Sequence, residues 1–446
     1  MTGRARIVVA LFAGCLFGAL VSGRDVFYNL TYLWAILLIV SYGWSRVALR
    51  GVELRREPRT LRAQVGRLFF ERITLHNHSR IPKLWVEAID ESELPGIKAT
   101  TVSIGLRFRG FANLPADQTA TVTIGMHSQQ RRTWIGRTLC TRRGRFRLGP
   151  MRLRSGDPFG LFPVTRDVPY NQHVVVLPMT VPLADFPLPT GRYPGGEALR
   201  YRTYQVTPNA ASVRDYAPGD SFNRIHWPST ARRMRLIVKE FEFDPLADIW
   251  LFLDAFGGTQ FERPIPEEDG GSSIFDVQDI ELPYSTIEYG VAAAASIALH
   301  FLQRDRSVGL VTYGGSRHVI QPERGESQLY RILESLAVLR AEGEMSLTDV
   351  LKIEGEYIPR GSTVVLITPA SSNALLDSIR SLQYEGRQPI LVQLEVDSFG
   401  GPDYETKMHD TVQRLGIPVR TVKAGQPLSM ALSPESPSGR RYKVAS

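Results

Sequence analysis

The residues best suited to chemistry in this chain lie together in residues 212–244, which read SVRDYAPGDSFNRIHWPSTARRMRLIVKEFEFD. A carboxylate beside arginine and histidine side chains can bind an anion or transfer a proton. The same residue types can also form a saturated polar network that locks a junction between domains. We favour the network because no nucleophile and no recognised order of catalytic residues accompanies it. Its members are Arg214, Asp215, Tyr216, Gly219, Asp220, Arg224, His226, Trp227, Arg232, Lys239 and Glu240.

Local signals predict how this segment folds. Pro218-Gly219 favours a tight turn, because proline fixes φ and glycine tolerates a positive φ. Pro228 suits the start of a short helix over 229–234. The alternation over 236–241 predicts a strand that leaves this helix. The segment is therefore expected to form one compact unit.

The order Arg-x-Tyr-x-x-Gly-Asp, Ile-His-Trp, Ala-Arg and Val-Lys-Glu-Phe resembles the signature of the prokaryotic family called domain of unknown function 58. A second block, residues 143–162 (RGRFRLGPMRLRSGDPFGLF), is similar to the Gly-Pro and Asp-Pro-Phe-Gly-Leu element of that family. The resemblance implies a membrane-anchored protein with a von Willebrand A-like region. It also implies association with a MoxR-type AAA+ ATPase, which would supply the energy for assembling or remodelling other proteins.

A von Willebrand A-like region usually holds a divalent metal at Asp-x-Ser-x-Ser after its first strand. Here the sequence is Asp254-Ala255-Phe256-Gly257-Gly258, so both serines are missing, and Pro369 follows the late strand where an aspartate is expected. Asp254 and Thr348 are the remaining degenerate metal-site positions. Two oxygen ligands are too few for an octahedral Mg²⁺ site, so we predict neither a metal nor another cofactor.

Searches for other catalytic motifs find none. The sequence has no Gly-x4-Gly-Lys-Ser/Thr loop, no His-Glu-x-x-His, no Cys-x-x-Cys and no Gly-x-Ser-x-Gly. His76 and His78 lie two residues apart on a predicted strand turn, and with no carboxylate or cysteine expected nearby, no metal role is predicted.

Composition places the chain at a membrane surface. The net charge is +8 and the chain has only two cysteines, Cys15 and Cys140, which gives no disulfide framework. Basic residues crowd just after the second apolar segment, and we attribute them to a lipid bilayer and not to nucleic acid. These residues are Arg46, Arg50, Arg55, Arg56, Arg59, Arg62 and Arg67.

Two apolar segments, residues 7–22 and 26–40, predict a transmembrane helical hairpin joined by Gly23-Arg24-Asp25. The arginines that flank its outer ends place both termini, and the large C-terminal part, in the cytoplasm. We thus expect a multi-pass protein of the inner (plasma) membrane. The alternative for the first segment is a cleaved signal peptide.

The rest of the chain predicts an α+β multidomain protein. Residues 53–185 hold short alternating runs typical of a β-sandwich, with strands expected at 72–76, 83–90, 101–108, 119–126, 145–153 and 173–177. Strands then alternate with helices, which indicates a von Willebrand A-like, doubly wound α/β domain. The expected domains are 1–50 (hairpin), 53–185 (β-sandwich), 186–247 (linker arm and signature unit), 248–432 (α/β domain) and 433–446 (disordered tail).

Within the α/β domain we expect strands at 248–253, 308–313, 317–321, 363–368, 389–396 and 418–422. The expected helices are 287–304, 327–340, 347–354, 373–384 and 406–415. The acidic loop 257–285 leaves the first of these strands and is either a solvated insertion or a surface for docking a partner.

Two classes of function follow. The first is a non-enzymatic scaffold or adaptor at the cell envelope that works with a MoxR-type AAA+ ATPase. The alternative is an envelope-associated hydrolase that uses Asp220 and His226.

Overall fold

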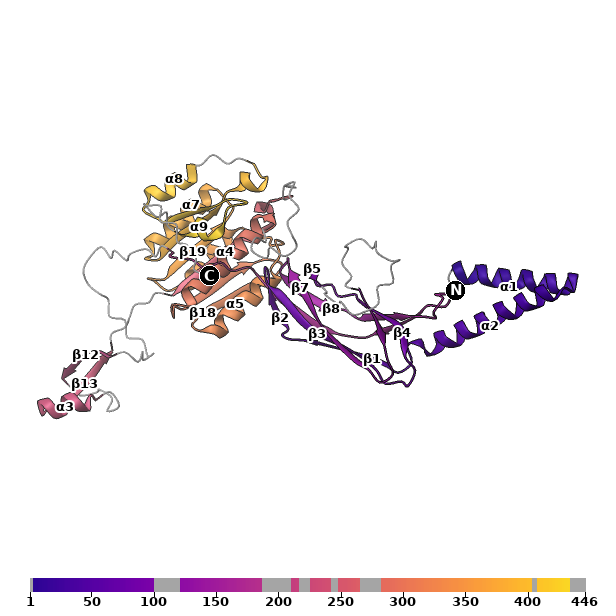
Figure 1. Cartoon of the computed structure of the whole chain (residues 1–446). Helices are drawn as coiled ribbons and strands as arrows, with labels where there is room; N and C mark the ends of the chain where they lie inside the picture. The colour runs from indigo at the N-terminus through magenta and orange to yellow at the C-terminus, as the bar shows by residue number, and fades with distance from the viewer. Residues whose placement is uncertain are drawn as a thin grey trace.

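The computed structural model describes residues 3–99, 121–186, 210–215, 225–241, 248–264, 282–402 and 407–433. Figure 1 shows three bodies in a row: two long N-terminal helices, a group of β-sheets, and a layered α/β domain. A small unit of two strands and one helix stands apart from the α/β domain. The group of β-sheets lies between the two N-terminal helices and the α/β domain. The β-sheets therefore determine how the helices and the α/β domain are placed.

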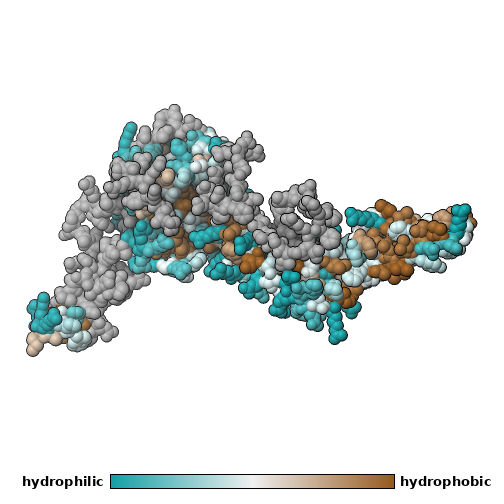
Figure 2. All heavy atoms as spheres, viewed as in Figure 1, coloured by the Kyte–Doolittle hydropathy of each residue, from teal (hydrophilic) through white to brown (hydrophobic). Residues whose placement is uncertain are grey.

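The N-terminal helices are α1 (Gly3–Ser22) and α2 (Asp25–Ala48). Both are long and apolar enough to cross a membrane, and 11% of each apolar stretch is buried inside the protein. Figure 2 shows hydrophobic side chains over the surface of this hairpin. Helices of this kind suit membrane spans and also a signal sequence. The second helix continues to Ala48, beyond the predicted apolar segment, and so carries Arg46 in its last turn.

The β-region contains two antiparallel four-stranded sheets, with orders β1-β3-β7-β5 and β10-β9-β4-β6, and a three-stranded sheet β2-β11-β8. Buried side chains from both four-stranded sheets form one apolar cluster, which includes Leu75, Trp134, Val86 and Leu153. The strands are β1 (Val52–Pro58), β2 (Arg62–Gln64), β3 (Leu68–Asn77), β4 (Lys83–Asp90), β5 (Gly96–Ala99), β6 (Thr121–Met126), β7 (Arg131–Cys140), β8 (Gly144–Leu148), β9 (Met151–Ser155), β10 (Val164–Val168) and β11 (Gln172–Leu177).

The strand predicted over 145–153 is wrong, because two strands, β8 and β9, occupy it. Gly149-Pro150 separates them. A Cβ atom at Gly149 would lie 2.5 Å from the Glu91 carbonyl oxygen, so only glycine permits this approach. The predicted strand at 83–90 is confirmed as β4, and the one predicted at 101–108 lies outside the described residues.

The α/β domain is built on a six-stranded sheet with the order β18-β17-β14-β19-β20-β21. The strands pair in parallel except β18, which is an antiparallel edge strand. They are β14 (Ile249–Leu253), β17 (Val308–Tyr313), β18 (Arg317–Glu323), β19 (Thr363–Thr368), β20 (Gln388–Leu394) and β21 (Val419–Val422). All five β14 side chains are buried, as expected of a central parallel strand covered on both faces.

Helices α4 (Thr286–Leu302) and α5 (Glu326–Val338) bury their apolar sides in one core cluster with the sheet. Helices α6 (Leu347–Glu354), α7 (Asn373–Tyr384) and α8 (Lys407–Arg414) contribute to a second cluster, and the short α9 (Leu428–Leu432) joins the first. Core residues of β14 alternate between the two clusters, which places helices on both faces of the sheet. The helices predicted at 347–354 and 373–384 are confirmed as α6 and α7.

The remaining elements are the separate unit, made of β12 (Ala210–Asp215), α3 (Trp227–Arg233) and β13 (Ile237–Phe241), and a two-stranded ladder of β15 (Glu262–Arg263) and β16 (Tyr284–Ser285). Short 3₁₀ turns occur at η2 (Gly257–Thr259), η3 (Gly355–Tyr357) and η4 (Val396–Phe399). Strand β12 begins at residue 210, two residues before the predicted signature segment 212–244, and it pairs antiparallel with β13.

Candidate functional site

The first candidate site is the carboxyl edge of the six-stranded sheet, where the chain reverses its direction of winding. From β14 the chain continues to β17 on one side and later to β19 on the other. In open parallel sheets, ligands bind at such a reversal point. Asp254 follows β14 and Thr368 ends β19, and the register between these strands pairs Leu253 with Ile367. The two polar residues consequently lie side by side.

The protein itself satisfies the Asp254 carboxylate. Thr368 donates from Oγ1 to Oδ2 at 2.6 Å, and the Phe256 amide donates to Oδ1 at 3.0 Å. Thr259 Oγ1 makes a longer contact of 3.4 Å with Oδ2. Among the described residues, no group of three histidine, cysteine or acidic side chains gathers at Asp254.

The assignment of Thr348 as the second degenerate metal-site position stays a prediction. Thr348 lies in the first turn of α6, whereas the hydroxyl donors to Asp254 are those of Thr368 and Thr259. Thr368 reaches Asp254 because it ends the neighbouring parallel strand, and sequence spacing alone does not show which strands are neighbours.

Burial raises the pKa of Asp254, and hydrogen bonds from Thr368, Phe256 and Thr259 oppose this rise. The side chain is 3% exposed. A buried carboxylate held by three donors is suited to fixing a loop, because most of its about four acceptor positions are already used.

The acidic loop begins beside this edge. Its two ends are held by β15 and β16, and Arg263 lies over the ring of Tyr284 with 5.4 Å to the ring centroid. Thr286, at the start of α4, donates to Gln260 at 2.7 Å. Residues 265–281 lie outside the described residues, so the two interpretations of this loop stay open.

The second candidate site is the signature unit. His226 donates its backbone amide to the Ile237 carbonyl at 2.8 Å, and Thr230 Oγ1 accepts from the Ile237 amide at 3.0 Å. These bonds close α3 onto β13. His226 Nδ1 lies 2.7 Å from Ser229 Oγ, a contact within the first turn of α3. The histidine therefore contributes to local structure at the start of the helix.

The exposed face of α3 carries Trp227, which is 65% exposed, and Arg232. Four signature residues, Arg214, Asp215, Lys239 and Glu240, lie on the paired strands β12 and β13. The other four, Tyr216, Gly219, Asp220 and Arg224, lie outside the described residues. The predicted polar network thus stays a prediction.

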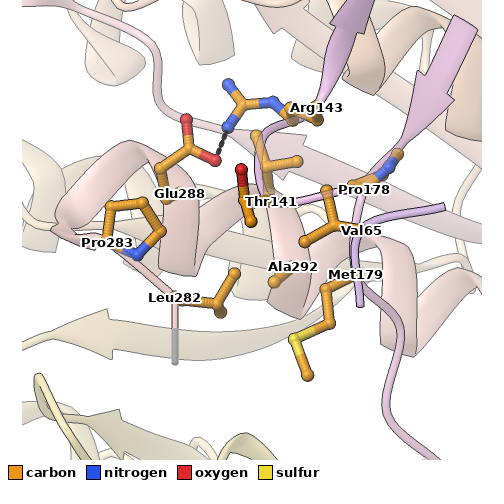
Figure 3. A pocket seen from close by; sticks show the side chains of 10 residues that line it. Val65, Thr141, Arg143, Pro178, Met179, Leu282, Pro283, Glu288 and Ala292 are labelled. Atoms are coloured by element: carbon orange, nitrogen blue, oxygen red, sulfur yellow. Dashed lines mark ion pairs between the residues drawn. The ribbon is translucent and has the colours of Figure 1, made fainter. Parts of the chain in front are cut away.

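The third feature is the junction between the β-region and the α/β domain, and it was not predicted. Arg143, the first residue of the second family-like block, donates from Nε to the Leu336 carbonyl at 3.1 Å and from Nη2 to the Leu339 carbonyl at 2.7 Å. It also forms an ion pair with Glu288 of α4, as Figure 3 shows. Leu336 and Leu339 belong to the C-terminal end of α5, whose last carbonyls have no partners within the helix.

A small cavity lies beside Arg143 in this junction (Figure 3). Its volume is about 10 Å³, which is room for about one water molecule. It is lined by apolar side chains that include Val65, Met179 and Leu282. The junction is therefore a packed interface between two bodies, and no organic substrate fits this cavity.

The opposite end of the β-region contacts α2 in a similar way. Lys83 Nζ donates to the Val47 carbonyl at 2.7 Å, and Arg166 donates to the carbonyls of Leu49 and Val52. The Phe162 ring meets Tyr42 edge to face with 5.8 Å between ring centroids. Cationic side chains of the β-region hence bind the C-terminal carbonyls of both α2 and α5, where the helix dipole favours them.

The structure changes the interpretation of the basic cluster. Arg56 is buried and forms ion pairs with Glu71 at 2.6 Å and Asp90 at 2.8 Å. Arg62 pairs with Glu334 of α5, so it belongs to the domain junction. Six of the seven arginines of the cluster are exposed, and Arg46 and Arg50 lie at the end of α2. Arg56 is thus not available to a membrane surface, because it is paired with buried carboxylates that the sequence does not reveal.

Comparisons with known proteins support the family resemblance. The family model described as "Protein of unknown function DUF58" matches residues 212–266. The "Uncharacterized protein YeaD" of Bacillus subtilis (strain 168) is 24% identical over 218 residues, which cover 49% of this chain and 48% of the relative. The chain spans about half the length of the curated relative that it matches. Both matches concern proteins of unknown function.

Similarity to solved structures is weak. The PapD-like domain 7 of human CEP192 matches with a TM-score of 0.16 and 12% identity, over 28% of this chain and 85% of that domain. A family 20 exo-β-N-acetylglucosaminidase from Vibrio harveyi matches with a TM-score of 0.17 and 8% identity, over 77% of this chain and 57% of the enzyme. Neither match supports an argument about fold or activity.

Proposed function

We propose that this chain is a membrane-anchored, non-enzymatic scaffold or adaptor that works with a MoxR-type AAA+ ATPase in protein assembly or remodelling. In this proposal α1 and α2 form a transmembrane hairpin in the inner membrane, with the large C-terminal part in the cytoplasm. The two four-stranded sheets form a β-sandwich, and the six-stranded sheet forms a von Willebrand A-like domain.

The observation that carries the proposal is the pair of junctions at the ends of the β-region. Lys83 and Arg166 bind the end of α2, and Arg143 binds the end of α5. The ion pair between Arg62 and Glu334, at 2.7 Å, adds to the second junction. In this proposal the two junctions fix the position of the α/β domain relative to the membrane anchor, as an adaptor requires.

The candidate sites support binding more than catalysis. The Asp254 carboxylate is occupied by protein donors, and His226 contacts Ser229 of its own turn. In contrast, α3 presents Trp227 and Arg232 on its exposed face. Aromatic and arginine side chains are the types most enriched where proteins bind one another.

The test is affinity capture of the tagged full-length chain from native membranes after cross-linking in the presence of ATP. We expect an AAA+ ATPase to be retained, and Trp227→Ala to reduce its yield. Tyr384→Ala serves as the matched control, because Tyr384 is a 90% exposed aromatic residue at the end of α7. Capture without any AAA+ ATPase would contradict the partnership.

The hydrolase alternative is tested by Asp220→Ala. If Asp220 belongs to a structural network, its removal lowers stability by about 1–3 kcal/mol, because a partner is left unpaired. Normal stability of Asp220→Ala together with failed complementation in cells would instead support an active or anion-binding site.

A further inference from the structure

Three side chains with metal-binding atoms meet on the outer surface of the β-region. Glu53 lies on β1, His76 lies on β3 and His78 directly follows β3. Their ligand atoms all lie within 4.8 Å of one another. Among the described residues, no other group of three histidine, cysteine or acidic side chains meets this criterion. The sequence prediction of no nearby carboxylate is wrong, because the β-sheet register supplies Glu53.

The backbone holds these residues on one face. The β1–β3 register places Glu53 directly opposite His76, and opposite residues in an antiparallel pair have neighbouring Cβ atoms. His76 and His78 are two residues apart and thus share a face. The His78 amide donates to the Gly51 carbonyl at 2.7 Å, which continues the pairing past the end of β3.

Asn77, between the two histidines, points inward and fixes the turn. It is fully buried, and its Nδ2 donates to the carbonyls of Ile81 at 3.0 Å and His127 at 2.9 Å. Its Oδ1 accepts from Ser79. Because Asn77 is held at three points, the histidines on either side of it are held outward.

The distances suit a tetrahedral metal ion. His78 Nε2 lies 2.8 Å from Glu53 Oε2, and the two imidazole rings are 3.8 Å apart between centroids. With zinc–ligand bonds of about 2.0–2.1 Å, ligand atoms in a tetrahedron lie about 3.3 Å apart. The ligand atoms, which all lie within 4.8 Å of one another, reach this separation by rotation of the side chains when an ion binds.

Outer contacts orient two of the ligands. Arg55 donates to Glu53 Oε1 at 2.7 Å, which leaves Oε2 directed at His78. A backbone hydrogen bond links the His76 ring to Gln129. Metal-bound histidine and carboxylate ligands are commonly held by such contacts.

We propose that Glu53, His76 and His78 form a binding site for a divalent transition-metal ion, with Zn²⁺ as its expected occupant. Two imidazoles and one carboxylate are typical zinc ligands, and they leave a fourth position for water or for a donor from a partner. The site lies immediately after α2, at the end of the β-region that faces the helical hairpin (Figure 1).

The experiment is a Co²⁺ titration of the full-length chain in detergent micelles, purified without a histidine tag. Tetrahedral Co²⁺ has visible absorption bands, and Zn²⁺ added afterwards should remove them. We expect one ion per chain. Loss of an outer contact typically weakens metal binding about 10–100-fold, so His78→Ala should weaken it at least as much. Glu53→Gln, which keeps the side-chain shape, should do the same.

His173→Ala is the matched control, because His173 is an exposed histidine on β11 outside the cluster. Circular dichroism of each variant shows whether it is folded, and Glu53→Gln keeps the test decisive if His78→Ala does not fold. Equal Co²⁺ binding by His78→Ala, Glu53→Gln and His173→Ala would overturn the proposal. Absence of binding by the wild-type chain would overturn it as well.

Discussion

Replacing Arg143 with alanine should loosen the junction between the β-region and the α/β domain. The side chain of Arg143 is 6% exposed and makes three polar contacts there, to Glu288 and to the carbonyls of Leu336 and Leu339. Hydrogen bonds to a charged group contribute about 1.5–3 kcal/mol each, and breaking a buried ion pair costs about 3–5 kcal/mol.

The net effect is smaller than the sum of these contributions. The side chain of Glu288 is 27% exposed, so water partly solvates its carboxylate after Arg143 is removed. The freed carbonyls lie at a helix end, where water can reach them. We therefore expect Arg143→Ala to lower the free energy of unfolding of the joined bodies by about 2–4 kcal/mol.

The assay is hydrogen–deuterium exchange followed by mass spectrometry on the full-length chain, together with equilibrium denaturation. Arg143→Ala should speed exchange in β8, β11 and the end of α5, while exchange in the central strands β14 and β19 stays near that of wild type. The matched control is Arg142→Ala, because Arg142 is exposed and adjacent. If the free energies of unfolding of Arg143→Ala and Arg142→Ala agree within about 0.5 kcal/mol, and their hydrogen–deuterium exchange is the same, Arg143 does not hold the junction.

Four further predictions follow from buried charges and from the hairpin. Burial raises the pKa of Asp254, so ionisation of this carboxyl group destabilises the folded state above its usual titration range. The free energy of unfolding of Asp254→Asn should therefore increase relative to that of wild type as the pH rises from about 4 toward 7. Denaturation curves measured across this pH range check the prediction. Mg²⁺ should not raise the Tm of either protein, whereas a bound ion at a hundredfold excess over its Kd would add about 2.7 kcal/mol. Arg56→Met should lower the free energy of unfolding by about 3–5 kcal/mol, because Glu71 and Asp90 are then left buried without their cation. Chemical denaturation measures this change, and a decrease below about 1 kcal/mol would refute the prediction. A reporter that works only in the cytoplasm should be active when it is fused at Ser446. Activity of only a reporter that works outside the cytoplasm would contradict the proposed orientation.

Much of the secondary structure was predictable from the sequence. Hydrophobic period and turn residues gave helices α6 and α7 and strands β4, β17 and β19 at their observed bounds. Short strands were harder to predict. Strands β1, β2, β5, β7 and β10 were missed. Strands β2, β5 and β10 have three to five residues and so carry few alternating positions, whereas β1 and β7 are longer but contain several arginines.

Site chemistry was predictable only where one segment contains it. Asp254 was identified because it follows a continuous apolar strand, and the signature unit because its turn, helix and strand are adjacent in sequence. The partner of Asp254 was not identified, because Thr368 is 114 residues away and reaches it through strand order.

The sequence by itself determined the apolar hairpin, the alternation of strands and helices, and the missing ligands after β14. Only the tertiary structure decided which charges meet: Arg56 pairs with carboxylates 15 and 34 residues away, and Arg143 binds a carbonyl 196 residues away. It also placed Glu53 beside His76 and His78. The physical reason is that periodicity reports which face of a segment is buried, whereas side-chain partners depend on sheet register and domain packing, which arise from contacts across the whole chain.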